Sequence, residues 1–147
     1  MATTTHDEIL VGGMAIRPRI EPAESDGAVA IHEFDVPAGG RLPVAHSHDA
    51  YEETIYGVRG TVTFTVEGVP HDIGPGATLF IPRGAIHAFA NTGAIDATAL
   101  AIITPGLLSA DYFREIAAIV DAAGGGGPPD LAAIADVMRR HGLTPAT

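Results

Sequence analysis

The chain of 147 residues contains no cysteine. This absence excludes disulfides, zinc fingers, iron–sulfur clusters and thiol nucleophiles. Any metal site must therefore be built from histidine and carboxylate ligands, and seven histidines are present. A cysteine-free composition fits a reducing compartment. The first residues, MATTTHDEIL, show neither the basic nor the apolar region of a secretory signal, so we expect a cytoplasmic protein.

Positive charge is also scarce. All eight basic residues are arginine, and the formal net charge is −10. A protein that follows a phosphate backbone needs a basic face, so we expect no nucleic-acid partner. No apolar run approaches the roughly 18–20 residues of a membrane span, so we expect no membrane partner.

The remaining pattern predicts one β domain followed by a helical tail. The length suits a single domain. Residues 1–8 are polar and expected to be loosely held. From about residue 9 to residue 104, short apolar or alternating runs are separated by glycine and proline, which is typical of an all-β sandwich or barrel. The expected strands include residues 28–36, 53–58, 61–66, 77–81, 87–91 and 97–103.

After Pro105 the apolar residues recur with the spacing of an α-helix. Ser109 is a candidate N-cap for a helix with an apolar stripe, and Asp130 is a candidate cap for a second helix. Leu131, Ile134, Val137 and Met138 form the stripe of this second helix. We therefore divide the chain into a β domain, residues 1–104, and a helical C-terminal extension, residues 105–147. The extension is expected over the barrel mouth or against a second subunit.

The segment around residue 46 concentrates metal ligands. His46 and His48 are two positions apart, which places both imidazoles on one face of a strand. Glu52 or Glu53 could add a carboxylate, and His87 follows downstream. Such a set suits Fe, Mn, Co, Ni, Cu or Zn.

These residues resemble the two motifs of the cupin superfamily. The first motif, G-x5-H-x-H-x3–4-E-x6-G, corresponds to Gly40, His46, His48, Glu53 and Gly60. The second, G-x5-P-x-G-x2-H-x3-N, corresponds to Gly76, Pro82, Gly84, His87 and Asn91. The helical tail is weakly similar to that of quercetinase-type cupins. The resemblance implies a small single-domain cupin with a double-stranded β-helix, or jelly-roll barrel.

It also implies that one divalent transition metal ion is bound by His46, His48, Glu53 and His87. Glu53 matches the motif spacing and Glu52 does not, and strand alternation points Glu52 away if Glu53 faces the metal. Glu53 could also act as a general base, which makes it the candidate catalytic residue. His32 is expected to be packed or at the rim.

A mostly apolar pocket is expected around this site. The candidate substrate-contacting residues are Ile55, Phe64, Leu79, Phe89 and Tyr51. Such a lining favours a small hydrophobic or aromatic chelating substrate, and we expect a dioxygenase-type oxidoreductase. A non-redox lyase, decarboxylase or isomerase remains open, as does a non-catalytic ligand-binding protein. A homodimer formed through one barrel sheet is also expected.

Overall fold

The computed structural model describes residues 4–146, which form eleven strands, one short 3-10 helix, η1 (Pro22–Ser25), and two α-helices. One group of strands comprises β1 (Ile9–Val11), β2 (Met14–Ile20), β3 (Ala30–Val36), β5 (Glu52–Arg59), β8 (Thr78–Ile81) and β10 (Ala97–Thr104). The other comprises β4 (His46–His48), β6 (Val62–Val66), β7 (Val69–Ile73), β9 (His87–Ala90) and β11 (Leu143–Pro145). The expected strands are present to within about two residues.

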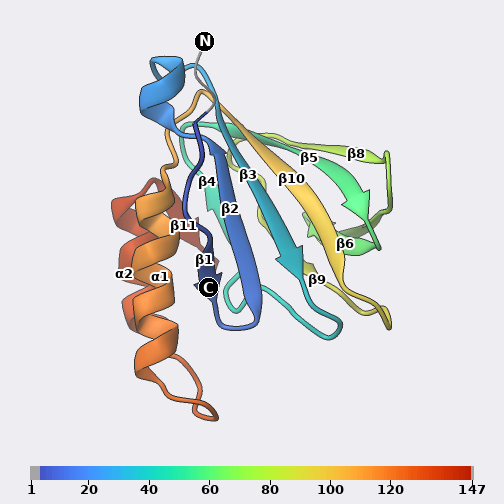
Figure 1. The fold of residues 1–147 in the computed structure, drawn as a ribbon, viewed down its shortest axis with the longest axis vertical. Helices are drawn as coiled ribbons and strands as arrows, with labels where there is room; N and C mark the ends of the chain where they lie inside the picture. The colour runs from blue at the N-terminus through green and yellow to red at the C-terminus, as the bar shows by residue number, and fades with distance from the viewer. Residues whose placement is uncertain (1–3, 147) are drawn as a thin grey trace.

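These strands build two antiparallel sheets (Figure 1). The first has the order β1-β2-β3-β10-β5-β8 and the second the order β11-β4-β9-β6-β7. Some neighbours are consecutive in the chain, such as β6 and β7, whereas others, such as β3 and β10 or β4 and β9, come from distant parts of it, as in a double-stranded β-helix. The predicted all-β jelly-roll class with two C-terminal helices is confirmed. Among residues 4–146, no helix has both the length and the apolar character to cross a membrane.

Side-chain alternation explains how the sheets enclose a core. In β3 every second residue, starting from Ala30, is buried. In β6 Val62 and Phe64 are buried, while Thr63 on the other face donates a hydrogen bond to Asp72. The face of β6 that carries Val62 and Phe64 therefore turns inward, since period-two alternation separates apolar from polar residues.

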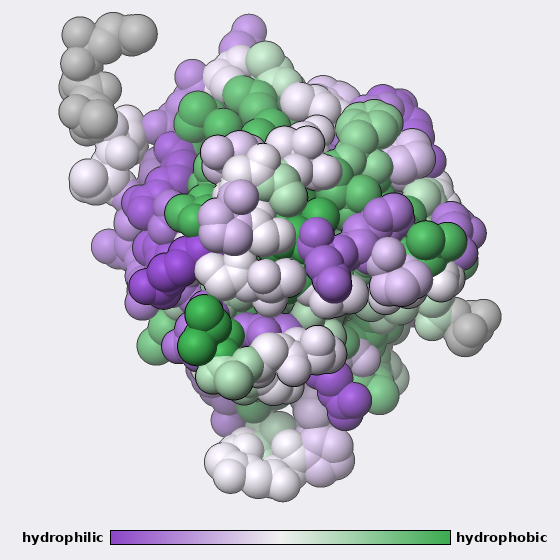
Figure 2. All heavy atoms as spheres, turned by 90° about the vertical axis from the view of Figure 1, so that its right-hand side faces the viewer, coloured by the Kyte–Doolittle hydropathy of each residue, from purple (hydrophilic) through white to green (hydrophobic). Residues whose placement is uncertain are grey.

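The outer face of the first sheet also carries apolar side chains near β8. Tyr56, Val58 and Phe80 are exposed there. Figure 2 shows the side of the molecule away from the helices, where hydrophobic patches lie between polar side chains. Scattered exposed apolar residues are ordinary on a protein surface.

The helices begin where the capping residues predict. Ser109 accepts a hydrogen bond from the Asp111 amide at the start of α1 (Ala110–Ala122), and Asp130 accepts one from the Ala133 amide at the start of α2 (Leu131–Arg140). The buried stripe of α2 includes Ile134 and Met138 as expected. The assignment of Leu131 to that stripe is wrong. It is 52% exposed because α2 starts next to the exposed connector that contains the four glycines.

The extension is not purely helical, which corrects the expectation for residues 105–147. Its last strand, β11, pairs with β4 at the edge of the second sheet. Both helices lie beside β1, β2 and β11 (Figure 1), and α1 packs directly on β1. Residues 4–8, part of the start that is expected to be loosely held, lie outside the strands and helices and are mostly exposed, and they make two side-chain contacts. His6 contacts Glu24, and Glu8 contacts Arg17; residues 1–3 of that prediction lie outside the described range.

Candidate metal centre

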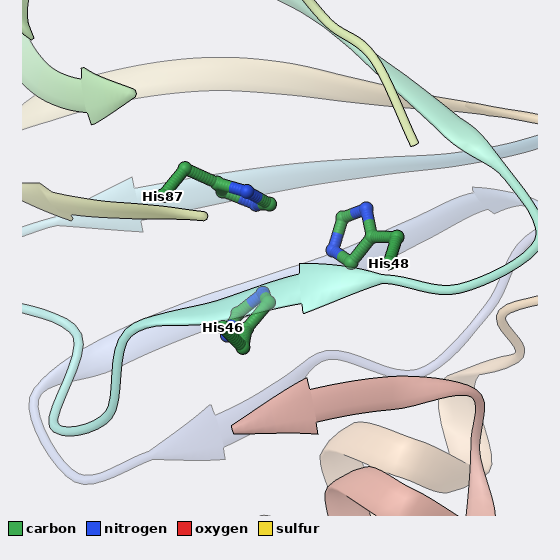
Figure 3. Close-up of side chains that lie close together, drawn as sticks. All are labelled: His46, His48 and His87. Carbon is green, nitrogen blue, oxygen red and sulfur yellow. The ribbon is translucent and has the colours of Figure 1, made fainter. Parts of the chain in front are cut away.

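Three histidines meet on the inner face of the second sheet. His46 and His48 extend from β4, and His87 extends from β9, where it is the cross-strand partner of His46 (Figure 3). One potential ligand nitrogen from each lies within 4.8 Å of the others. Two nitrogens on one ion, each about 2.0–2.1 Å from it, lie about 3–4 Å apart. The three rings are therefore close to the spacing that a shared ion requires.

Backbone carbonyls orient two of these rings. Nδ1 of His46 lies 3.3 Å from the carbonyl oxygen of Val44, and Nδ1 of His87 lies 2.9 Å from that of Ala85. A carbonyl can only accept, so Nδ1 of each ring is the protonated donor. Nε2 then carries the free lone pair that a metal needs. Such outer hydrogen bonds fix both the tautomer and the ring orientation of ligating histidines.

Glu53 approaches the histidines from the opposite sheet. Its Oε2 lies 3.4 Å from Nε2 of His87 and 3.6 Å from Nε2 of His48. Glu52 points the other way and binds Arg83 with Oε1 at 2.7 Å. The alternation predicted for this strand therefore holds. Whether Glu53 ligates a metal and acts as a base stays a prediction.

The electrostatics differ among the three histidines: for His87 burial is outweighed by contact with the Glu53 carboxylate, which raises its pKa. Burial, together with the neighbouring His87 and His48, lowers the pKa of His46 to about 3. Burial also lowers the pKa of His48. Burial opposes ionisation of Glu53, but contact with His87 and the charge of the nearby imidazoles outweigh it and lower its pKa. Metal binding requires deprotonated ligands, so an ion would displace any proton held between His87 and Glu53. Three imidazoles and a carboxylate are donors that suit a divalent transition metal ion.

Tyr51 packs against the histidine cluster on the side away from the cavity. Its ring stacks on that of His48, with centroids 4.7 Å apart and planes 28° apart, and it is 1% exposed. Its hydroxyl donates to the carbonyl of His141 at 3.4 Å. Tyr51 does not line the cavity described below, so its position differs from that of a substrate contact. It packs against the ring of His48 instead.

A cavity of about 100 Å³ opens in front of the histidines. It is lined by Phe64 and Phe89, two of the five residues predicted to contact the substrate. Ile55 and Leu79 face one another across β5 and β8 and do not line it. The cavity runs from the histidines toward β1, β2 and the helices, away from β8, which explains why these two residues are outside it.

Sequence reasoning missed much of the cavity wall. The extension supplies apolar side chains from both helices and from β11, and the first two strands supply more. These residues are Val11, Met14, Ile16, Leu108, Tyr112, Phe113, Ile116, Ile134, Met138 and Leu143. The apolar stripe of α1 was visible in the sequence, but a stripe alone does not distinguish helix packing from a binding cavity. His32 also lines the cavity and is buried, so it is not at a rim.

Comparison with known proteins supports the architecture. Residues 32–103 match the family described as Cupin domain. Residues 32–103 thus form a cupin domain. It is 26% identical over 110 residues to Quercetin 2,3-dioxygenase of Bacillus subtilis (strain 168), a match that covers 75% of this chain and 32% of that protein. This cupin thus spans about a third of that relative's length.

Two solved structures are similar in fold to this chain. One is a predicted oxalate decarboxylase from Thermotoga maritima, with a TM-score of 0.61, 24% identity, and coverage of 71% of this chain and 99% of that chain. The other is the polyketide cyclase RemF from Streptomyces resistomycificus, with a TM-score of 0.60, 22% identity, and coverage of 78% and 92%. Identities this low show the fold alone, because one fold hosts many functions.

Proposed function

We propose that this cupin is a mononuclear metal-dependent enzyme of the dioxygenase type that acts on a small, mostly apolar chelating substrate. The observation that carries the proposal is the position of His46, His48, His87 and Glu53 at the wall of an apolar cavity. The weak similarity to a quercetin dioxygenase supports the oxidative reaction. When bound, a divalent transition metal ion would supply Lewis acidity toward a chelating oxygen and, for a redox-active metal, electrons for chemistry with O2.

Different residues of the chain would bind the ion, accept a proton and contact the substrate. Each of the three clustered histidines would bind the ion through the ring nitrogen that carries no proton. That nitrogen is Nε2 in His46 and His87. The Glu53 carboxylate would ligate it, since its lowered pKa keeps it ionised at neutral pH, or would accept the proton of an acidic hydroxyl on the substrate. The phenyl rings of Phe64 and Phe89 would pack against the apolar part of the substrate and exclude water.

The cavity volume restricts the substrate further. A cavity of about 150 Å³ in another protein accommodates benzene, and the cavity here is about 100 Å³. Because this cavity is smaller, a single ring, or an aliphatic group of similar size, is an upper limit for an occupant that leaves the wall in place. A three-ring flavonol would require the helices to shift. We therefore expect one-ring catechols and short 1,3-diketones to be better substrates than flavonols.

Metal analysis with an oxygen-uptake assay tests the proposal. Wild type and His87→Ala are expressed with Fe, Mn, Co and Ni supplied in turn. We expect about one ion per chain in wild type and loss of that ion in the variant. We then expect oxygen uptake with a catechol or a 1,3-diketone only in the loaded wild type. Loaded protein that consumes no oxygen with any of these compounds would contradict the dioxygenase reaction.

A non-redox reaction is the second candidate. Glu53 lies beside two histidines, where a base could take a proton next to a carbonyl that a Lewis acid polarises. The structural likeness to a polyketide cyclase and a predicted oxalate decarboxylase is compatible with this class. Solvent deuterium exchange into a 1,3-diketone, catalysed by the loaded protein without oxygen, would support it.

A further inference from the structure

His32 is a buried polar residue in the cavity wall that the proposed metal centre does not use. It lies in β3, is 1% exposed, and lines the cavity. Its Nε2 lies 3.2 Å from the carbonyl oxygen of Leu108. Its Nδ1 is buried and has no hydrogen-bond partner among residues 4–146. Buried polar atoms are nearly always paired, so an unpaired one calls for a partner.

The contacts of His32 determine what that partner must be. The Leu108 carbonyl can only accept a hydrogen bond, so the ring proton lies on Nε2. Burial lowers the pKa of His32, which keeps the ring neutral. Nδ1 therefore presents a lone pair and acts as an acceptor. Its partner must be a donor, such as a hydroxyl group.

The ring of His32 is also held in a fixed orientation. Phe113 of α1 contacts it edge-on, with centroids 4.9 Å apart and planes 72° apart. The Leu108 carbonyl holds its other nitrogen. A rigid acceptor binds a donor with little loss of conformational freedom. The ring is thus prepared to bind a partner that enters the cavity.

His32 lies on a different wall of the cavity from the histidine cluster. In the first sheet it pairs with Ala101, while Glu53 pairs with Ile103 of the same central strand, β10. Two strand spacings separate β3 from β5, about 10 Å. A one-ring ligand that faces the histidines with one substituent could therefore present another substituent to His32.

We propose that Nδ1 of His32 accepts a hydrogen bond from a hydroxyl group of the ligand, so that the preferred ligand is a hydroxylated one-ring or similarly small molecule. The proposal rests on the proposed function only for the other end of the ligand, which faces the histidines. A buried acceptor rejects an analogue that lacks the donor, because the acceptor then stays unpaired. His32 would thus determine specificity rather than take part in the reaction.

Binding of phenol and toluene to the full chain tests this assignment. The two molecules have nearly the same shape, but only phenol donates a hydrogen bond. Their dissociation constants are measured by NMR titration for wild type and His32→Leu, with and without EDTA. We expect the preference for phenol over toluene to fall about five- to tenfold in His32→Leu, the effect of one neutral hydrogen bond. His71→Leu, on β7 outside the cavity, is the matched control and should retain the preference.

A measurement on wild type keeps the proposal testable if His32→Leu folds poorly. The ¹⁵N resonance of His32 Nδ1 should shift when phenol binds and should move much less with toluene. An unchanged resonance, a preference that survives in His32→Leu, or no phenol binding to wild type would overturn the proposal. So would a preference lost in His87→Ala but kept in His32→Leu, since the hydroxyl would then bind at the metal centre. Absence of metal from wild type would contradict the proposed function and leave this result unaffected.

Discussion

Leu143 is the antiparallel partner of His48 and joins the C-terminal extension to the strand that carries two of the three clustered histidines. Its side chain is 1% exposed and lines the cavity. The short strand β4 is therefore held on one edge by β9 and on the other by β11. The position of the histidines depends on residues far away in the sequence.

Leu143→Ala should lower the free energy of unfolding by about 2–5 kcal/mol, the usual cost of truncating a buried leucine. It should also weaken metal binding, because β4 loses packing on its outer edge. Leu131→Ala is a matched control, since Leu131 is half exposed and should change stability by less than about 0.5 kcal/mol. Urea unfolding and a metal titration measure both effects. Equal losses in the two variants would contradict the role of β11.

Glu53→Gln and Glu52→Gln separate two adjacent carboxylates. Glu53 lies beside His48 and His87, whereas Glu52 makes an ion pair with Arg83. We expect Glu53→Gln to raise the metal dissociation constant at least about tenfold, because the amide carries no charge. Glu52→Gln should leave it within about twofold, since exposed ion pairs contribute little. Competition with a chromophoric chelator measures both constants, and similar values for the two variants would show that Glu53 is not the ligand.

Two substitutions at Tyr51 distinguish its stacking from its hydroxyl group. Tyr51→Phe keeps the ring against His48 and removes only the long hydrogen bond to His141, so metal affinity should change little. Tyr51→Leu removes the stacked ring and should weaken metal binding about tenfold or more, as loss of an outer support usually does. If Tyr51→Phe weakened binding as much as Tyr51→Leu, the hydroxyl rather than the stacking would support the site.

The pair Arg17–Asp35 should make stability depend on pH. Arg17 contacts Asp35 with Nη2–Oδ1 at 2.6 Å, and this hydrogen bond lowers the pKa of Asp35. The ionised form is therefore stabilised by folding, and its contribution is present above the unfolded pKa of about 3.9 and lost as the pH falls through the folded pKa. Asp35→Asn should cost about 1 kcal/mol at pH 7, after allowance for solvent screening, and progressively less as the pH falls below the unfolded pKa.

Asp136→Asn is the control for that experiment. Asp136 makes an ion pair with Arg139 in which both side chains are more than half exposed. In denaturant unfolding at several pH values, the free energy of unfolding of Asp136→Asn should follow pH as that of wild type does. A constant cost of Asp35→Asn between pH 7 and pH 2 would mean that the charge of Asp35 is not the source of stability.

The expected homodimer would use the outer face of the first sheet. Phe80 of β8 is 60% exposed, with Tyr56 and Val58 also exposed on the neighbouring strand. Phe80→Arg should then shift the mass measured by light scattering from dimer to monomer. Leu107→Arg, at an exposed position before α1, should leave the mass unchanged. A monomeric wild type would refute the dimer.

The local pattern was sufficient to predict the histidine cluster and the orientation of Glu53. Motif spacing places His46 and His48 on one face of a strand, and alternation separates Glu53 from Glu52. The residues that form the cavity wall were harder to predict from the sequence. Ile55 and Leu79 turn inward as alternation predicts, but whether an inward residue meets a cavity depends on how the sheets and helices pack. Nothing within ten residues of Leu143 indicates that it pairs with His48.

The same limit applies to His32. Its place among apolar residues of β3 predicts burial, and the structure confirms burial. Its unpaired nitrogen depends on where Leu108 and Phe113 lie, more than seventy positions away. Such long-range placement has no signature in the sequence around His32.

Both ends of the described chain contribute to the cavity wall, with Val11 on β1 and Leu143 on β11. Because α1 packs on β1, the first strand and the extension support each other. A fluctuation that releases either segment would admit water to the cavity, so we expect the two segments to open together in local unfolding. The cavity therefore exists only while contacts between the most distant parts of the chain are in place.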